Sequence, residues 1–216
     1  MTPRRAFSAI AAALFTTALA AVPAQASAGD AIAKGSVGTV NATVAGEAVT
    51  VDAIAPCDTV GPPQGSSGEV AVDGFVTFTS GTSTCTVNDA GEIASVEVKG
   101  GRLRIDALRD HGGPRIRLSS YEARCNTTLT GSSSWVQFSG ASGFAVPENL
   151  PANHVVTIPG ASGQPPLATI TLNETIVPSP ADGSMTVNLM HVRLFPQGGP
   201  DSGDIVVGSV HCAPVD

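Results

Sequence analysis

The amino-acid sequence predicts an all-β fold: a single disulfide-stapled domain of about ten short strands, arranged as a β-sandwich or a barrel. Short runs rich in valine, isoleucine and threonine alternate with clusters of glycine, proline, serine and aspartate about every ten residues. No stretch repeats apolar residues with a helical period over three turns. Beyond residue 28 there are 24 glycines and 14 prolines, well above the usual combined fraction of about 12%. These observations exclude long helices.

The first 28 residues have the order expected of a secretory signal. The pair Arg4-Arg5 precedes an apolar run, Ala6–Val22, and small residues suited to cleavage follow at Ala24-Gln25-Ala26. A retained membrane anchor fits less well, because the run has only 17 residues. We therefore expect residues 1–28 to be removed on export, by the general secretory (Sec) or the twin-arginine (Tat) route, and residues 29–216 to form the mature domain.

The charge balance limits the classes of partner. The full chain has a formal net charge of −7, from 11 basic and 18 acidic residues. Loss of the two signal arginines brings the mature charge to about −9, which argues against a nucleic-acid backbone or an anionic membrane as the main partner. No second apolar run is long enough to span a membrane, so we expect no membrane span after cleavage. No motif predicts a cofactor.

Four cysteines follow the signal: Cys57, Cys85, Cys125 and Cys212. An even count in an exported chain predicts two disulfides, and four cysteines allow three pairings. We favour Cys57 with Cys85, which would close the loop containing Gly61–Gly65, and Cys125 with Cys212, which would tie the last strand to the middle of the chain. A thiolate metal site is not expected, because clustered spacings such as C-x-x-C are absent.

The expected strands are separated by short segments with turn-forming residues, none long enough to be an interdomain linker. They are Val37–Val44, Ala48–Ile54, Glu69–Thr79, Ile93–Val98, Leu103–Leu108, Arg115–Ala123, Ser134–Phe138, His154–Ile158, Ala168–Ile176, Met185–Phe195 and Ile205–Cys212. One domain is therefore the expectation.

One hairpin is specific enough to predict its register. Two of the expected strands flank the turn segment Asp110–Gly113. The expected cross-strand pairs are Leu103–Ser120, Ile105–Leu118 and Ala107–Ile116. This register buries one face of the hairpin. The opposite face then carries Arg102, Arg104, Asp106, Arg115, Arg117 and Tyr121, with Asp106 opposite Arg117.

The arginines of this hairpin form a basic patch on an acidic protein, because six of the seven mature arginines lie between Arg102 and Arg124. The candidate patch consists of Arg102, Arg104, Arg115 and Arg117. One interpretation is capture of an anionic group, such as a phosphate-bearing wall polymer or an acidic partner. The other, which the sequence favours, is a solvated polar face that discourages pairing at a sheet edge.

Three segments towards the C-terminal end resemble the closing motifs of a known family. Thr169–Glu174, Thr186–Val192 and Gly203–Cys212 are similar to segments of the choice-of-anchor P proteins, secreted or surface proteins of actinobacteria that are named for their varied C-terminal attachment signals. The resemblance covers residues 167–212 and is looser upstream. It implies an extracytoplasmic location, either released to the medium or associated with the cell wall. It implies no mechanism, because the family has no established catalytic residues.

Glu174 is the main candidate for a buried polar group in these segments. Strand alternation predicts that it shares a face with Ile170 and Leu172, where a lone carboxylate is strongly destabilising unless it is paired. His191 and His211 are the natural partners. Such a pair could form an acid–base dyad, but we favour a structural hydrogen bond that fixes strand register.

No catalytic or metal motif accompanies this pair. Gly140–Gly143 and Gly160–Gly163 lack the G-x-S-x-G spacing of hydrolases, and Asp201 with Asp204 supplies too few carboxylates for calcium. The sequence therefore favours an exported, non-enzymatic β-protein that binds an unknown partner in the cell envelope or the medium. One alternative is a carbohydrate-binding module that uses Trp135, although aromatic residues are few. Another is a hydrolase that uses Glu174 with His191 or His211.

Overall fold

The computed structural model describes residues 29–199 and 201–215, so the predicted signal, residues 1–28, lies outside the described residues. The described chain is all-β, as predicted, and its only helix is one 3₁₀ turn, η1 (Arg109–His111). The strands are β1 (Ile32–Val44), β2 (Glu47–Ile54), β3 (Cys57–Asp58), β4 (Gln64–Ser67), β5 (Val70–Val72), β6 (Val76–Phe78), β7 (Gly81–Val87), β8 (Ala94–Gly100), β9 (Leu103–Ile105), β10 (Ile116–Leu118), β11 (Ser120–Thr127), β12 (Ser132–Ser139), β13 (His154–Ile158), β14 (Ala168–Ile176), β15 (Met185–Leu194) and β16 (Ser202–Ala213).

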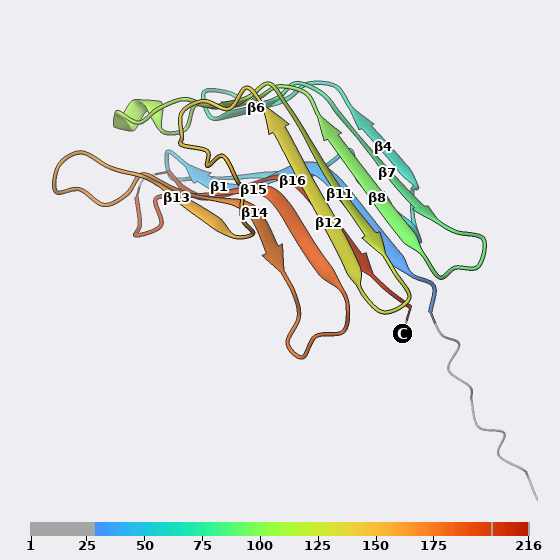
Figure 1. Cartoon of the computed structure of the whole chain (residues 1–216). Coiled ribbons are helices and arrows are strands. Elements are labelled where there is room, and N and C mark those ends of the chain that lie inside the picture. The colour runs from blue at the N-terminus through green and yellow to red at the C-terminus, as the bar shows by residue number, and fades with distance from the viewer. Residues whose placement is uncertain (1–28, 200, 216) are drawn as a thin grey trace, which may run out of the picture.

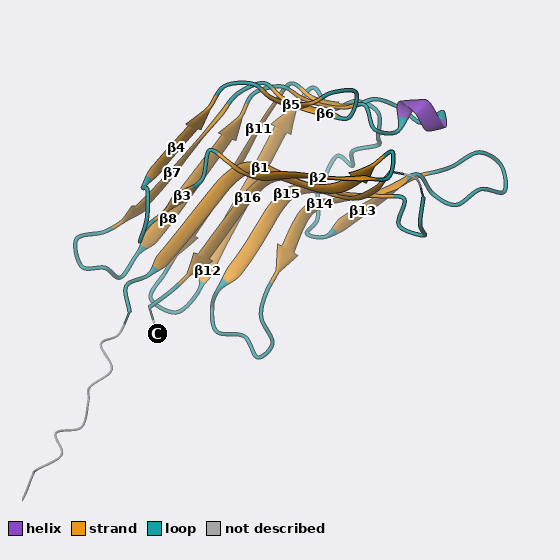
Figure 2. Ribbon diagram, turned by 180° about the vertical axis from the view of Figure 1, so that it is seen from behind, coloured by secondary structure: helices purple, strands orange, loops and turns teal. Residues whose placement is uncertain are grey.

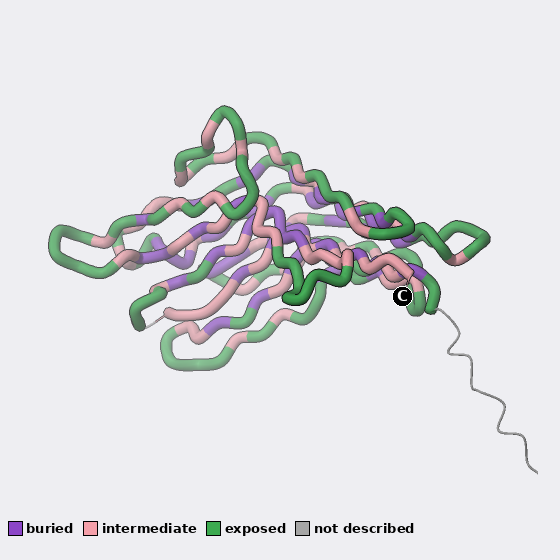
Figure 3. The backbone as a smooth tube through the Cα atoms, turned by 60° about the horizontal axis from the view of Figure 1, so that its bottom comes forward, coloured by how far each residue is buried: buried purple, intermediate pink, exposed green. Residues whose placement is uncertain are grey.

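The strands form two layers that pack face to face (Figure 1). One layer is a seven-stranded antiparallel sheet with the order β13-β14-β15-β16-β1-β2, in which β3 also pairs with β1. The other layer contains a five-stranded sheet, β12-β11-β8-β7-β4, and a four-stranded sheet, β10-β9-β6-β5. Figure 3 shows that the buried residues lie along the strands, whereas the connecting loops are exposed. The arrangement is therefore sandwich-like, as the strand pattern predicts.

The five-stranded and four-stranded sheets are two parts of one bent layer (Figure 2). β4 continues into β5, β6 into β7, β8 into β9 and β10 into β11, and the strands keep the same order in both parts. At the bend, the Thr79 amide donates to the Arg102 carbonyl at 3.0 Å, and the Arg102 amide donates to the Thr79 hydroxyl at 2.8 Å. These backbone groups therefore keep hydrogen-bond partners at the bend.

Two predicted strands are each two strands in the structure. Glu69–Thr79 is a tight hairpin of β5 and β6, with Gly74 at a φ of 69° in the turn. Arg115–Ala123 is divided at Ser119 into β10 and β11. The prediction also missed β3, β4 and β7, because these strands are short or rich in serine, threonine and glycine and so lack alternating apolar residues.

The β9–β10 hairpin is shifted by two residues from the predicted register. Ile105 faces Ile116 and Leu103 faces Leu118, and the predicted pairs with Leu118, Ser120 and Ala107 do not form. The connection contains η1 and takes more residues than the expected turn. Because a shift of two residues keeps every side chain on its face, the predicted buried face is correct: Leu103, Ile105, Ile116 and Leu118 are all buried.

Tyr121 lies in the core, whereas the predicted register placed it on the exposed face of the hairpin. The bend at Ser119 changes which side of the chain faces inward, so Tyr121 is only 3% exposed. A Cβ at Gly100 would lie 1.9 Å from the ring of Tyr121, and the Tyr121 hydroxyl donates to the Val37 carbonyl of the opposite layer at 3.1 Å. Burial raises the pKa of Tyr121 well above its ordinary value, so the phenol stays a neutral donor.

The seven-stranded sheet has a matching irregularity near its middle. Asn173 on β14 and Gly208 on β16 have positive φ values of 50° and 62°, and Leu189 of β15 lies between them in the sheet. The inward side of each strand changes at this line; on β16, Ile205 and Val207 are buried before Gly208, and Val210 and Cys212 after it. Glu174 therefore lies on the outer face, not on the face of Leu172 as predicted.

Both predicted disulfides are confirmed, and each joins the two layers. Cys57 of β3 is bonded to Cys85 of β7, and Cys125 of β11 to Cys212 of β16. β3 and the end of β16 both pair with the start of β1, so the two bonds lie at the same end of the sandwich. At the other end, Asp201 accepts hydrogen bonds of 2.8 Å from the Ala45 amide and from Nε2 of His111.

Removal of the Cys125–Cys212 disulfide is expected to destabilise the protein more than removal of Cys57–Cys85. The two bonds join cysteines 87 and 28 residues apart, and loop entropy in the unfolded chain then assigns them about 4–5 and about 3–4 kcal/mol. Urea unfolding of the Cys125→Ala/Cys212→Ala and Cys57→Ala/Cys85→Ala variants measures both losses against the wild type. An equal or reversed order would contradict an explanation from loop size.

Candidate functional site

The predicted arginine patch lies on the outer face of the four-stranded sheet. Arg104 of β9 and Arg117 of β10 are directly opposite one another, and Arg102 precedes β9 at the bend. All three side chains are exposed. Like charges that face each other across an antiparallel pair repel one another, so this arrangement favours a negative group nearby.

Arg102, Arg104 and Arg117 line one pocket of about 450 Å³. Leu118, two serines and a glycine complete its wall: Ser119, Ser142 and Gly140. Arg117 and Ser142 exchange two backbone hydrogen bonds of 3.0 Å, which bring the segment after β12 to the pocket. Gly140 permits this close approach, because its φ is 59° and a Cβ there would lie 2.0 Å from the Ser119 hydroxyl. The described residues of this wall include no carboxylate.

One carboxylate neutralises part of the patch. Asp106 pairs with Arg104 at 2.9 Å and, through its other oxygen, with Arg115. It does not face Arg117 as predicted, because the hairpin register is shifted. Within residues 29–199 and 201–215, no carboxylate lies within 4.0 Å of the guanidinium of Arg102 or Arg117. The predicted patch therefore divides into three pocket arginines and Arg115, which lies against Asp106.

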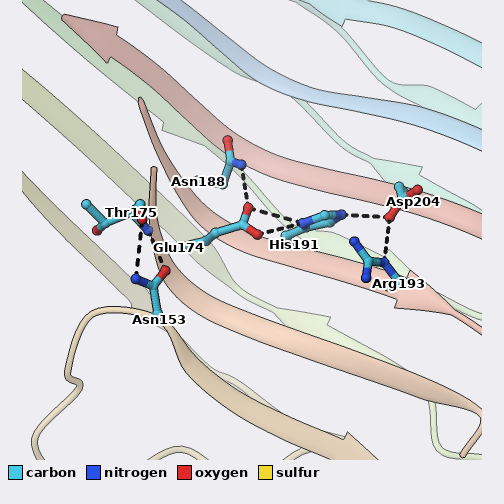
Figure 4. Close-up of polar contacts among 7 residues, drawn as sticks. All are labelled: Asn153, Glu174, Thr175, Asn188, His191, Arg193 and Asp204. Atoms are coloured by element: carbon cyan, nitrogen blue, oxygen red, sulfur yellow. Dashed lines mark hydrogen bonds and ion pairs between the residues drawn. The ribbon is translucent and has the colours of Figure 1, made fainter. Parts of the chain in front are cut away.

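Glu174 pairs with His191 on the outer face of the seven-stranded sheet (Figure 4). Nδ1 of His191 lies 2.9 Å from Oε1 of Glu174, and Nε2 lies 2.8 Å from Oδ1 of Asp204. Asn188 donates to the other Glu174 oxygen at 2.7 Å, and Nε of Arg193 lies 3.5 Å from the same Asp204 oxygen. These side chains form one chain of polar contacts across β14, β15 and β16.

The irregular backbone of β14 makes these contacts possible. Asn173, at positive φ, brings Glu174 to the side of the sheet on which His191 lies. The Asn153 amide group holds the strand beyond this point, because it accepts from the Thr175 amide at 2.8 Å and donates to the Thr175 carbonyl at 3.3 Å (Figure 4). A regular strand would have kept Glu174 beside Leu172.

The two carboxylates favour the charged form of His191. Burial acts to lower the pKa of His191, but the hydrogen bonds and charges of Glu174 and Asp204 together outweigh it and raise the pKa above its ordinary value. The imidazolium then donates from both ring nitrogens, one to each carboxylate. No ring nitrogen is left to take a proton from a substrate, which favours a structural role for the pair.

His211 lies apart from Glu174, so of the two predicted partners only His191 meets it. Nδ1 of His211 lies 3.0 Å from the Thr186 hydroxyl. Burial and the charge of Lys34 lower the pKa of His211, which keeps the ring neutral near pH 7. His211 lines a separate pocket with Lys34 and other residues of β1 and β3.

Trp135, the candidate for a sugar platform, is 46% exposed on the outer face of β12. The guanidinium carbon of Arg124 lies over its ring, 5.3 Å from the centroid. Arg124 also pairs with Glu97 at 2.7 Å, and this ion pair helps to hold the guanidinium over the indole ring. Arg124 therefore occupies one face of the only tryptophan.

Sequence reasoning did not identify Ser119 or Ser142 as pocket residues. Ser142 belongs to Gly140–Gly143, which the sequence correctly indicates as a loop. Its place beside Arg117 depends on a contact between segments that are far apart in the chain. The only local signal is Gly140, which marks a possible close approach of backbone.

The two aspartates considered for calcium are engaged elsewhere. Asp201 accepts from His111 and from the Ala45 amide, whereas Asp204 contacts His191 and Arg193. Among the residues that the structure describes, no group of three or more histidine, cysteine or acidic side chains could hold a metal ion.

The described residues contain no helix that is both long and apolar enough to cross a membrane. Comparisons with protein-family models, with curated proteins and with solved structures find no match to this chain. None of them bears on the resemblance to the choice-of-anchor P proteins, which stays a prediction.

His191 is expected to stabilise the fold more at acidic pH than at alkaline pH. Because its folded pKa is raised above the unfolded value of about 6.5, its contribution is complete below that value and is lost as the pH rises through the folded pKa. Urea unfolding of the wild type and His191→Gln from about pH 5 to about pH 9 should give a difference of about 1–3 kcal/mol at the acid end that shrinks towards the alkaline end. A difference that did not change with pH would show that His191 is not charged in the folded protein.

Proposed function

We propose that this protein is an exported, non-enzymatic β-sandwich protein that binds an anionic group of an envelope or extracellular partner in the pocket of Arg102, Arg104 and Arg117. One observation carries the proposal: Arg102 and Arg117 line the same pocket, and neither has a carboxylate partner among the described residues. Guanidinium groups bind phosphates and carboxylates through paired hydrogen bonds, and the serines of the pocket supply further donors.

The net negative charge of the protein favours one kind of anionic partner over another. The mature chain carries about nine negative charges in excess, so its long-range field repels a large polyanion. At physiological ionic strength, however, charges are screened over about 8 Å, and contacts inside the pocket are much shorter. A partner with single, spaced phosphate or carboxylate groups suits this combination better than a densely charged polymer.

The proposed site of action is the medium or the cell wall. Residues 1–28 have the pattern of a secretory signal, and disulfides persist mainly in oxidising compartments outside the cytoplasm. The resemblance to the choice-of-anchor P proteins supports the same location.

The two alternatives have weaker support. The exposure of Trp135 supports a carbohydrate-binding surface there, but Arg124 covers one face of the ring. A hydrolase centred on Glu174 and His191 would need a free proton acceptor, and both ring nitrogens of His191 already contact carboxylates.

Replacement of both Arg102 and Arg117 by serine is expected to weaken anion binding by about tenfold or more, because the pocket then keeps only Arg104, which Asp106 already neutralises. Isothermal titration calorimetry with inorganic phosphate and with glycerol 3-phosphate, at low ionic strength, measures the change. Arg109→Ser is the matched control, because it removes an exposed arginine of the same layer that does not line the pocket.

Equal affinities in the double variant and the control would overturn the proposal. Both variants should unfold at the same urea concentration as the wild type, because the replaced side chains are exposed. A pull-down from the envelope of the producing cell with the same three proteins then tests the partner, which should be lost only with the double variant.

A further inference from the structure

A second pocket lies on the outer face of the seven-stranded sheet and has a volume of about 390 Å³. Its polar residues come from neighbouring strands in two adjacent rows. In one row, Lys34 of β1 lies between His211 of β16 and Asp58 of β3. In the next row, Ser36 of β1 is directly opposite Ser209 of β16. Five polar side chains therefore meet at one place on the sheet.

These side chains retain hydrogen-bonding capacity. Lys34 pairs with Asp58 at 3.1 Å, but an ammonium group has three donors. His211 uses Nδ1 for Thr186, and its other nitrogen has no hydrogen-bond partner among the described residues. The same holds for the hydroxyls of Ser36 and Ser209, each of which both donates and accepts. The pocket thus offers several donors and acceptors to a ligand.

The rest of the wall is apolar and fixed in position. Ala53, Pro56 and Pro62 contribute aliphatic surface beside the polar rows. The Asp58 amide donates to the Pro62 carbonyl at 2.8 Å, and the Asp58 carboxylate accepts from the Val60 amide at 3.0 Å, so the loop over the pocket is a closed turn. The Cys57–Cys85 disulfide anchors the start of this loop to the opposite layer. A wall that is already ordered reduces the entropy lost on binding.

The charges of this pocket cancel. The ammonium of Lys34 is matched by the carboxylate of Asp58, and the pKa of His211 is lowered, so its ring carries no charge near pH 7. An anion would meet Asp58, and a cation would meet Lys34. A neutral ligand that has several hydroxyls on its edge and aliphatic C–H groups on its face matches both kinds of wall.

We infer that this pocket binds a neutral sugar residue, with its hydroxyls on Ser36, Ser209 and the Lys34–Asp58 pair and its C–H face against Pro56 and Pro62. The inference does not depend on the arginine pocket, which lies on the outer face of the opposite layer. One molecule can therefore hold an anionic group on one side and a sugar residue on the other.

The test is an NMR titration of the ¹⁵N-labelled mature protein with glucose, galactose, arabinose and N-acetylglucosamine. At least one of these sugars should shift the amide signals of residues 34–36, 57–61 and 209–211, with an affinity in the millimolar range that is usual for a site of few contacts. Ser209→Ala and Asp58→Asn should weaken binding by about fivefold or more, because the first removes a hydroxyl and the second replaces a charged acceptor oxygen, which also pairs with Lys34, by an amide NH₂ that only donates.

Two control variants separate this site from other surfaces. Ser133→Ala removes an exposed serine hydroxyl from the opposite layer, and Arg117→Ser disables the arginine pocket; both should bind the sugar as the wild type does. Since Asp58 also closes its own loop, Ser209→Ala decides the result if Asp58→Asn does not fold.

The inference is overturned if none of the four sugars shifts these amides at up to about 100 mM, well above the expected dissociation constants. It is also overturned if the shifts gather around Trp135, or if Ser209→Ala and Ser133→Ala bind equally well. Because Arg117→Ser leaves this pocket intact, failure here is distinguishable from failure of the anion-binding proposal.

Discussion

The packing of Tyr121 between the two layers determines how the rest of the sandwich fits together. Its ring lies against Gly100 of its own layer and near Gly208 of the opposite layer, and neither position has room for a larger side chain without a shift of its neighbours. Its hydroxyl satisfies the Val37 carbonyl, which belongs to the opposite layer. Both layers change their inward side next to this ring, one at Ser119 and the other at Gly208. The two irregularities therefore have to coincide, because a regular sheet could not follow a bent one and keep its core closed.

The same irregularities create the candidate sites. Arg102 reaches the arginine pocket because it lies at the bend between β8 and β9, and Ser119 reaches it from the bend between β10 and β11. On the other layer, the positive φ of Asn173 brings Glu174 to His191. Where the regular alternation of side chains is interrupted, polar side chains lie on the outer face. There they can contact one another or a ligand.

The positions of the carboxylates show which basic side chains are paired within the protein and which are available to a partner. His191 lies between Glu174 and Asp204, Lys34 is paired with Asp58, and Arg124 is paired with Glu97. In an acidic protein such pairing is readily achieved. Arg102 and Arg117 are the exceptions on the outer face of the four-stranded sheet, and they converge on a pocket whose described wall has no acidic residue. Solvation alone would require neither convergence nor serines in the wall, and the proposed anion binding rests on this difference from the solvated face that the sequence favours.

Features encoded in local sequence patterns could be predicted before the structure was known. The alternation of Leu103 and Ile105, and of Ile116 and Leu118, predicts the buried face of the hairpin, and the cysteine positions predict both disulfides. The sequence also predicts that Glu174 pairs with a histidine, but its reason, a carboxylate buried beside Leu172, does not hold, because Glu174 lies on the outer face. The tertiary structure alone decided that Tyr121 is buried, that Glu174 lies on the outer face with His191 rather than His211, and that Ser142 meets Arg117. The physical reason is that side-chain alternation has a period of two only while the backbone is regular. A single residue with positive φ or a bend reverses it, and packing against the opposite layer determines where those reversals occur.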